Sequence, residues 1–287
     1  MKKLLFFLLI IIILSQGCIA KNNSYFAIEV GTKPNQLGYN KGLEFCSGPI
    51  AITEFESKIF VLDKENYKIN VYSIMGDFLN FIKIPNGFKY RDIVVNPESK
   101  DITLLTDKGI YIIKNDKLKK INELPDIIKN PYYLAIDKHG NIGMTGLDNK
   151  GRLKTGIYSL EGFIELNGFG LFFSYSGIQC LQTNHKEVLF IDNNSIVKKL
   201  FIDIQSDATP IGIDDEMNVY YVEPIKRGLI IYRIDKNEKI VNKKVNYSSR
   251  LIEDPVDVIR FMRVTPKGEI IALEVNPTEC RVLRINL

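Results

Sequence analysis

Residues 48–63 read GPIAITEFESKIFVLD, an apolar run that ends in a polar residue, then a short turn, then a second apolar run. The same pattern recurs five more times. Its six copies begin their paired runs at Ile50 and Ile59, Ile93 and Ile102, Leu134 and Ile142, Gln179 and Val188, Ile211 and Val219, and Met262 and Ile270. The polar residue that ends the first run lies at positions 53, 96, 137, 183, 214 and 265, at intervals of 43, 41, 46, 31 and 51 that average about 42 residues. A strand-rich repeat of this length is typical of a β-propeller.

Most copies continue with two further strand-like segments, so a repeat holds four strands. In the first copy these segments are 68–72 and 78–82, joined by the turn Met75-Gly76-Asp77. Alternating apolar and charged residues on the later segments favour outer strands with one solvated face. One such sheet buries a single face, whereas blades arranged radially cover each other and leave only short edges. The sequence therefore predicts an all-β, six-bladed β-propeller of four-stranded antiparallel blades.

The last copy supplies only three strands before Leu287, whereas the segment 24–30 near the N-terminus is strand-like and belongs to no repeat. We expect this N-terminal strand to complete the sixth blade. Closing the ring in this way removes the last open sheet edge.

The first copy resembles an NHL-type repeat. The shared theme is a proline before an apolar strand, here Pro49, an apolar-x-Val-x-Asp segment at 59–63, and a Gly-Asp-Phe turn at 76–78. The third and fifth copies keep the proline as Pro131 and Pro210, whereas the other three do not. The resemblance covers roughly residues 48–287 and implies the six-bladed fold. It implies no particular function, because propellers serve as lectins, scaffolds, receptors and hydrolases alike.

The chain begins with a processing signal. Lys2 and Lys3 precede an unbroken apolar run, residues 4–14, which is too short to span a bilayer and is typical of a secretory signal peptide. The run leads into Leu14-Ser-Gln-Gly-Cys18, which resembles a bacterial lipobox. The resemblance implies removal of residues 1–17, lipidation of Cys18, a short tether over 18–23 and a propeller over 24–287. Secretion without lipidation and a retained anchor helix are the alternatives.

The charge balance of the chain argues against nucleic acid as a partner. The chain has 38 Lys and Arg against 34 Asp and Glu, and loss of Lys2 and Lys3 leaves a nearly neutral domain without a block of like charge. Nucleic acid is therefore not an expected partner. No Pro/Gly/Ser-rich linker divides the repeats, so they form one domain.

Three cysteines remain beyond Cys18. Cys180 lies inside an apolar run and reads as a small buried hydrophobe. Cys46 and Cys280 come from the first and last copies, which are neighbours in a closed ring, so a disulfide between them is open at this stage. No Cys-x-x-Cys occurs, so neither a redox motif nor a zinc site is indicated. We expect no metal and no cofactor.

The sequence offers no catalytic constellation. Its two histidines, His139 and His185, each lie in a predicted turn, and no nucleophile elbow or phosphate loop is present. The main enzymatic alternative is a metal-dependent hydrolase of the gluconolactonase-like type. In that interpretation Asn96, Asp137 and Asp214 would supply oxygen ligands to calcium around the channel. In the other interpretation these residues cap the turns that they begin.

A binding surface is the favoured functional prediction. The connections that enter the inner strands lie on one face of a propeller and are rich in tyrosine and arginine, which are enriched in binding hot spots. The candidate binding residues are Tyr90, Arg91, Tyr132, Tyr133, Tyr175, Thr209 and Arg260. The alternative is that the aromatic side chains only pack between blades. We therefore predict an exported protein, membrane-anchored through acylated Cys18, that binds another envelope protein or a small ligand without catalysis.

Overall fold

The structure is a computed structural model that describes residues 23–42, 46–114, 117–159, 162–168, 170–174, 176–184, 186–192, 195–204, 208–249 and 258–287. The predicted signal peptide, Cys18, Tyr175 and His185 lie outside the described residues. No helix in the described ranges is long and apolar enough to cross a membrane.

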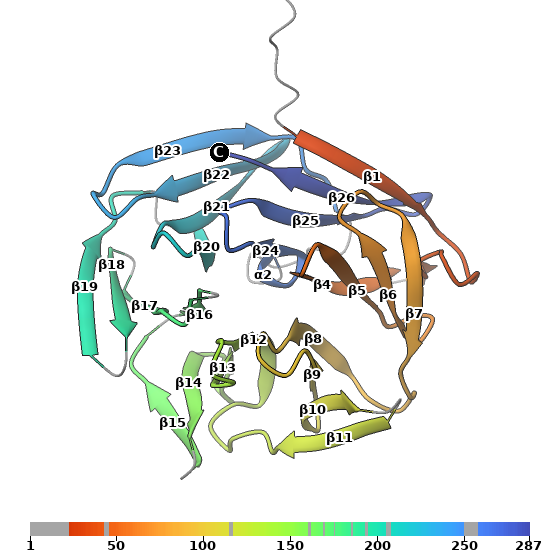
Figure 1. Ribbon diagram of the computed structural model, residues 1–287, viewed down its shortest axis with the longest axis horizontal. Coiled ribbons are helices and arrows are strands. Elements are labelled where there is room, and N and C mark those ends of the chain that lie inside the picture. Colours follow the sequence, from red (N-terminus) through yellow and green to blue (C-terminus); the bar gives the residue numbers. More distant parts are fainter. Residues whose placement is uncertain are drawn as a thin grey trace, which may run out of the picture.

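Six four-stranded antiparallel sheets are arranged as blades around a central axis (Figure 1). The first blade comprises β4 (Pro49–Phe55), β5 (Lys58–Asp63), β6 (Lys68–Ser73) and β7 (Phe78–Lys83). The second comprises β8 (Tyr90–Val95), β9 (Ile102–Thr106), β10 (Gly109–Lys114) and β11 (Lys117–Asn122). The third comprises β12 (Asn130–Ile136), β13 (Ile142–Leu147), β14 (Leu153–Ser159) and β15 (Gly162–Leu166).

The remaining three blades repeat this plan. The fourth comprises β16 (Gly170–Phe173), β17 (Gln179–Asn184), β18 (Glu187–Asp192) and β19 (Ser195–Phe201). The fifth comprises β20 (Thr209–Ile213), β21 (Val219–Ile225), β22 (Gly228–Ile234) and β23 (Ile240–Val245). The sixth comprises β24 (Met262–Val264), β25 (Ile270–Val275), β26 (Glu279–Ile285) and β1 (Asn23–Glu29). A short hairpin, β2 (Asn40–Lys41) with β3 (Cys46–Ser47), precedes the first blade, and the helix α2 (Val258–Phe261) precedes β24. The predicted six-bladed fold is confirmed.

Because neighbouring strands are antiparallel, the connections alternate between two faces of the ring. The entry face holds the segments that lead into each inner strand and the turns between second and third strands, such as 64–67, 107–108, 148–152 and 226–227. The exit face holds the turns that leave the inner strands, such as 96–101, 137–141, 214–218 and 265–269. These names are kept below.

The hydrophobic core lies between blades. Each buried cluster joins neighbouring sheets: one contains Leu62 of the first blade with Ile93 of the second, and another contains Tyr221 of the fifth with Phe172 of the fourth. Phe261 and Ile52 join the sixth blade region to the first. Burial of a large apolar side chain contributes about 1.5–3 kcal/mol. Neighbouring blades therefore stabilise each other around the ring.

The N-terminal strand closes the ring as predicted. β1 pairs with β26 over seven residues, from Asn23 opposite Ile285 to Glu29 opposite Glu279. Ile28 is buried in the cluster shared by the sixth and first blades. The last open edge of the sixth blade is thus covered by a strand from the other end of the sequence.

The segment that follows β1 is held against the first blade by a buried lysine. Lys68 Nζ donates hydrogen bonds to the carbonyl oxygens of Lys33 (2.8 Å), Pro34 (3.0 Å) and Gln36 (2.8 Å). Burial lowers the pKa of Lys68, whereas the nearby Asp63 carboxylate raises it. The Lys68 side chain is 4% exposed, so its ammonium group satisfies three carbonyls that would otherwise lose hydrogen-bond partners.

The prediction for the fourth blade was wrong by one strand. The inner strand is β16, and Gln179 begins the second strand instead of the first. Ser174 ends the inner run, and its hydroxyl accepts a hydrogen bond from the Ile178 amide (3.0 Å), the capping role that larger polar residues play in other blades. The apolar run before Ser174 is short and follows a glycine, which hid it. With Ser174 as marker, the intervals around this copy become 37 and 40 residues.

This correction moves the aromatic segment at 172–176. Phe172 is buried in the fourth blade, whereas Ser174 and Ser176 belong to the hairpin from β16 to β17 on the exit face. The segment was predicted to form a connection on the entry face. Tyr175 itself is outside the described residues.

The cysteines are thiols where the structure describes them. Cys180 is buried in β17, as predicted, and burial raises its pKa. Cys280 is a free, buried thiol in β26. Cys280 therefore takes part in no disulfide, and the side chain of Cys46 lies outside the described part of the structure.

Candidate functional site

The helix α2 lies across the axis at the entry face. It contacts the inner strands β4, β12 and β20, and Figure 1 shows it near the centre of the ring. Val258, Ile259 and Phe261 are buried in three different inter-blade clusters. Arg260 is the partly exposed residue of this helix. The entry face therefore presents an arginine over the axis of the propeller.

Below α2, a buried ion pair crosses the axis. Arg263 of β24 donates from Nη2 to Oδ1 of Asp92 in β8, and from Nη1 to the Ile259 carbonyl oxygen of α2. Asp92 Oδ1 also accepts from its neighbour's amide, Ile93 N (2.9 Å), and Oδ2 accepts from Leu134 N (2.8 Å) in β12. The pair thus joins the second, third and sixth blades.

An aromatic ring completes this network. The guanidinium of Arg263 lies over the ring of Tyr133, 4.8 Å from its centroid, in the range of a cation–π contact. Burial raises the pKa of Tyr133 and that of Asp92, and the charge of Arg263 opposes the shift at both. The network has a structural role, because both carboxylate oxygens of Asp92 are occupied.

Two arginines lie within electrostatic reach of Lys64 at the entry face. Arg91 Nη2 donates to Asn130 Oδ1 (3.3 Å) of the next blade. Burial lowers the pKa of Lys64, and the charges of Arg260 and Arg91 lower it further against the opposing effect of Glu65. These three side chains, Lys64, Arg91 and Arg260, are called the entry-face cations below.

Bulges in the inner strands position two of the predicted binding residues. The register of β8 shifts between Tyr90 and Asp92, and that of β12 shifts between Pro131 and Tyr133. The extra residues are Arg91 and Tyr132. A bulge changes the direction of the side chain that it adds. Arg91 and Tyr132 therefore occupy equivalent positions in the inner strands of neighbouring blades.

The structure separates the predicted binding residues into two groups. Arg91, Tyr132, Thr209 and Arg260 are partly exposed. Tyr90 and Tyr133 are buried: Tyr90 donates its hydroxyl to the Pro85 carbonyl oxygen (2.5 Å), and Tyr133 packs on Phe172 with ring centroids 5.2 Å apart. These two tyrosines therefore follow the packing alternative.

Sequence reasoning missed Lys64, Asp92 and Arg263. A signal for two of them was present, since Asp92 and Arg263 are charged residues inside segments where other copies carry apolar side chains, glycine or proline. A charge at a buried position is expected only with a partner. Nothing in the sequence showed that these two residues, 171 positions apart, are that pair.

The candidate metal ligands of the hydrolase alternative cap exit-face turns. Asp137 Oδ1 accepts from His139 N (2.8 Å) and Asn141 N (2.9 Å). Asp214 makes the same bonds with Glu216 N (3.0 Å) and Asn218 N (2.9 Å), and its Oδ2 accepts from Tyr220 Oη (2.8 Å). Asn96 Oδ1 accepts from Glu98 N (2.9 Å) and Ser99 N (3.1 Å). Among described residues, no three His, Cys, Asp or Glu side chains gather in a metal-binding group. This donor set does not fit a channel metal.

A small cavity of about 110 Å³ lies along the axis between the inner strands of all six blades. Most of its lining residues are apolar, with Val94, Ala135, Phe173 and Val264 among them, and it also touches Tyr133 and Arg263. It reaches the exit-face residues Pro97 and Pro266. The axial space therefore lies on the exit side of the ion pair.

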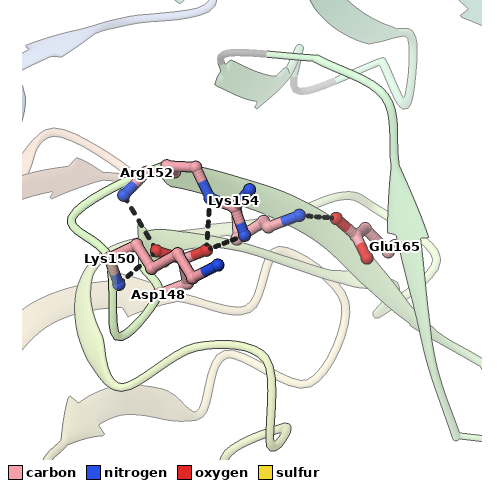
Figure 2. Close-up of polar contacts among 5 residues, drawn as sticks. All are labelled: Asp148, Lys150, Arg152, Lys154 and Glu165. Atoms are coloured by element: carbon pink, nitrogen blue, oxygen red, sulfur yellow. Dashed lines mark hydrogen bonds and ion pairs between the residues drawn. The ribbon is translucent and has the colours of Figure 1, made fainter.

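One entry-face turn of the third blade is fixed by its own charges (Figure 2). Asp148 Oδ1 accepts from Lys150 N (2.8 Å) and Arg152 N (2.9 Å), and Oδ2 accepts from Arg152 Nε (2.8 Å). These hydrogen bonds lower the pKa of Asp148 to about 2, and the bond from the Arg152 amide has the largest effect. Lys154 pairs with Glu165 beside the turn (2.5 Å). The charges of Asp148, Arg152, Lys154 and Glu165 thus have partners within the blade.

The chain matches no protein-family model and no curated protein in sequence. Solved structures of similar fold include virginiamycin B lyase from Staphylococcus aureus (TM-score 0.56, 12% identity, 92% of this chain and 100% of that one). Another is a Bacteroides fragilis protein inferred to be exported (TM-score 0.54, 13% identity, 94% of this chain and 97% of that one). A third is a Xanthomonas campestris gluconolactonase (TM-score 0.54, 9% identity, 91% of this chain and 98% of that one). At these identities the likeness shows the β-propeller fold alone.

Proposed function

We propose that this protein is an exported, lipid-anchored propeller that binds or scaffolds a partner at the bacterial envelope and catalyses no reaction. The observation that carries the proposal is the buried Asp92–Arg263 pair on the axis, with the entry-face cations above it. The Arg263 guanidinium on the axis is held by Asp92 and the Ile259 carbonyl oxygen, so the cations above it carry the exposed chemistry of this face. The exposed chemistry of this face is that of recognition, because arginine and tyrosine dominate binding hot spots.

Two enzymatic neighbours receive less support. For the gluconolactonase-like alternative, the oxygens of Asn96, Asp137 and Asp214 already accept hydrogen bonds within their own turns. A variant of the neighbouring lyase is described as catalytically inactive after a histidine was replaced by alanine. This chain has two histidines, of which the described one, His139, is exposed in an exit-face turn.

Replacing Arg91 and Arg260 together with alanine should weaken capture of the partner from detergent-solubilised envelopes at least tenfold. The melting temperature should stay within a few degrees, because partly exposed substitutions usually cost about 0.5 kcal/mol or less. Quantitative affinity capture followed by mass spectrometry measures the first effect, and calorimetry the second.

The matched control replaces Lys138 and Lys267 on the exit face with alanine and should capture as the wild type does. Equal capture by both double variants would contradict the role of the entry face. Hydrolysis of a lactone or ester by the wild type, lost with a chelator and restored by calcium, would favour the enzymatic alternative.

Replacing Cys18 with alanine should abolish incorporation of radiolabelled palmitate and release the protein from membranes. Acyl chains stabilise membrane attachment by about 0.8 kcal/mol per buried methylene, so the unacylated chain lacks the main source of affinity. A Cys180→Ala variant provides the control, because its thiol is buried in the fold. Equal labelling with and without Cys18 would rule out lipidation there.

A further inference from the structure

A groove of about 410 Å³ opens on the entry side of the first blade, away from the axis. Its walls come from the turn between β5 and β6, the strand β7 with the connection after it, and the segment held by Lys68. Residues that matter for its chemistry are Thr32, Tyr67, Phe81, Lys83 and Asn86. A volume of this size is within the range of small-ligand sites, about 300–1,000 Å³.

Tyr67 has an unusual backbone for an aromatic residue. Its φ is 49°, in the left-handed region that glycine adopts without steric cost. The corresponding turns of the second, third and fifth blades use Gly109, Gly151 and Gly228 at positive φ. Among the described non-glycine residues with positive φ, Tyr67 is the one aromatic. This blade thus uses an aromatic residue at positive φ in a turn where three other blades use a glycine, at a cost in conformational energy.

The ring is presented to solvent. Tyr67 is 45% exposed, which is high for an aromatic side chain next to a rigid sheet. Phe81 forms part of the same groove, and its ring is supported by the buried Lys68 ammonium, 5.8 Å from the centroid. The groove therefore combines the exposed ring of Tyr67 with the ring of Phe81, which contacts the Lys68 ammonium.

Polar side chains lie beside these rings. Thr32, Lys83 and Asn86 are all exposed and supply a hydroxyl, an ammonium and an amide. Aromatic faces next to hydrogen-bonding side chains match the chemistry of a sugar, because a pyranose has an apolar C–H face and a rim of hydroxyls that both donate and accept. A proline-rich peptide would also use the rings, but its prolines offer only carbonyl acceptors, whereas Thr32 and Asn86 can also accept hydrogen bonds.

We propose that this groove is a saccharide-binding site in which a sugar ring stacks on Tyr67 and its hydroxyls bond to Asn86 and Lys83. The site is separate from the entry-face cations and does not depend on them. An oligosaccharide of two or three units suits the volume of the groove. The strained backbone of Tyr67 places the ring that makes the stacking contact.

The test measures binding of cellotriose, chitotriose and maltotriose by saturation-transfer NMR and titration calorimetry. We expect one of the three to bind the wild type at millimolar or lower concentration. A Tyr67→Gly variant should lose at least tenfold in affinity while keeping its melting temperature within a few degrees, because glycine fits the local backbone. A Tyr67→Phe variant keeps the ring and should retain affinity within about threefold.

Lys100→Gly is the matched control, since Lys100 also has a positive φ (60°) but lies in an exit-face turn. It should bind as the wild type does, and so should the Arg91→Ala, Arg260→Ala double variant, which separates this site from the proposed partner surface. Undiminished binding by Tyr67→Gly would overturn the proposal. Absence of binding by all three sugars would overturn it too, as would binding of a proline-rich peptide in their place.

Discussion

Replacing Arg263 with methionine should lower the free energy of unfolding by about 3–5 kcal/mol and the melting temperature by roughly 6–20 °C. The cause is the Asp92 carboxylate, which is fully buried and would lose its counter-charge. The substitution also removes the donor to the Ile259 carbonyl oxygen and so loosens α2. Calorimetry together with urea unfolding followed by circular dichroism measures the loss.

Two comparisons isolate the charge effect. The Asp92→Asn, Arg263→Met double variant should be more stable than Arg263→Met alone, because no unpaired charge stays buried. Arg227→Met, at an exposed arginine, should change the free energy of unfolding by about 0.5 kcal/mol or less. A loss below about 1 kcal/mol for Arg263→Met would show that water or another group compensates Asp92.

Deleting residues 23–29 should prevent the chain from folding to a stable monomer. The deletion removes all seven residue pairs between β1 and β26 and uncovers the cluster that contains Ile28 and Val282. It also removes the contact of Phe26 with Tyr72, whose ring centroids are 5.8 Å apart. These losses approach the whole stability of a typical domain, about 5–15 kcal/mol. Size-exclusion chromatography and calorimetry would show aggregation and no cooperative transition.

A peptide of residues 23–30 added in trans should restore part of the monomer, because it can pair with the exposed edge of β26. Tyr25→Ser is the control within β1, since Tyr25 is 63% exposed and its loss should be tolerated. A truncated chain that still melts cooperatively at the wild-type temperature would show that ring closure contributes little to stability.

The repeat pattern was sufficient to predict the fold because its signal is local. Each hairpin joins neighbours in the sequence, and both 68–72 and 78–82 were correctly predicted as strands. The expected solvated face occurs in β7, whereas residues 68–72 of β6 are all buried. The fourth blade failed because its inner run, Leu171 to Phe173, is short, and Thr183 imitated the polar residue that ends an inner strand. In the first blade, β4 likewise runs two residues past Thr53, to Phe55. When apolar runs have similar lengths, the sequence pattern alone does not show which run forms which strand of the blade.

The candidate sites were less predictable because they depend on contacts between blades. Arg91 and Tyr132 were candidates from the connections that enter the inner strands, and in the structure each is the extra residue of a bulge. The burial of Tyr90 could not be predicted from the sequence. The bulge in β8 gives Tyr90 and the next residue different environments, although they are adjacent in the chain. The strained turn at Tyr67 carried no sequence signal beyond the missing glycine.

The pairing of β1 with β26 also has a consequence for the timing of biogenesis. β1 is synthesised first, but its partner β26 is synthesised only after five complete blades, and Asn23 must then pair with Ile285. Contacts of such long sequence separation form late and slowly. Until then the incomplete chain carries two open sheet edges, which are sites of aggregation. Shielding of an extended strand would therefore protect this protein most before its last blade is complete.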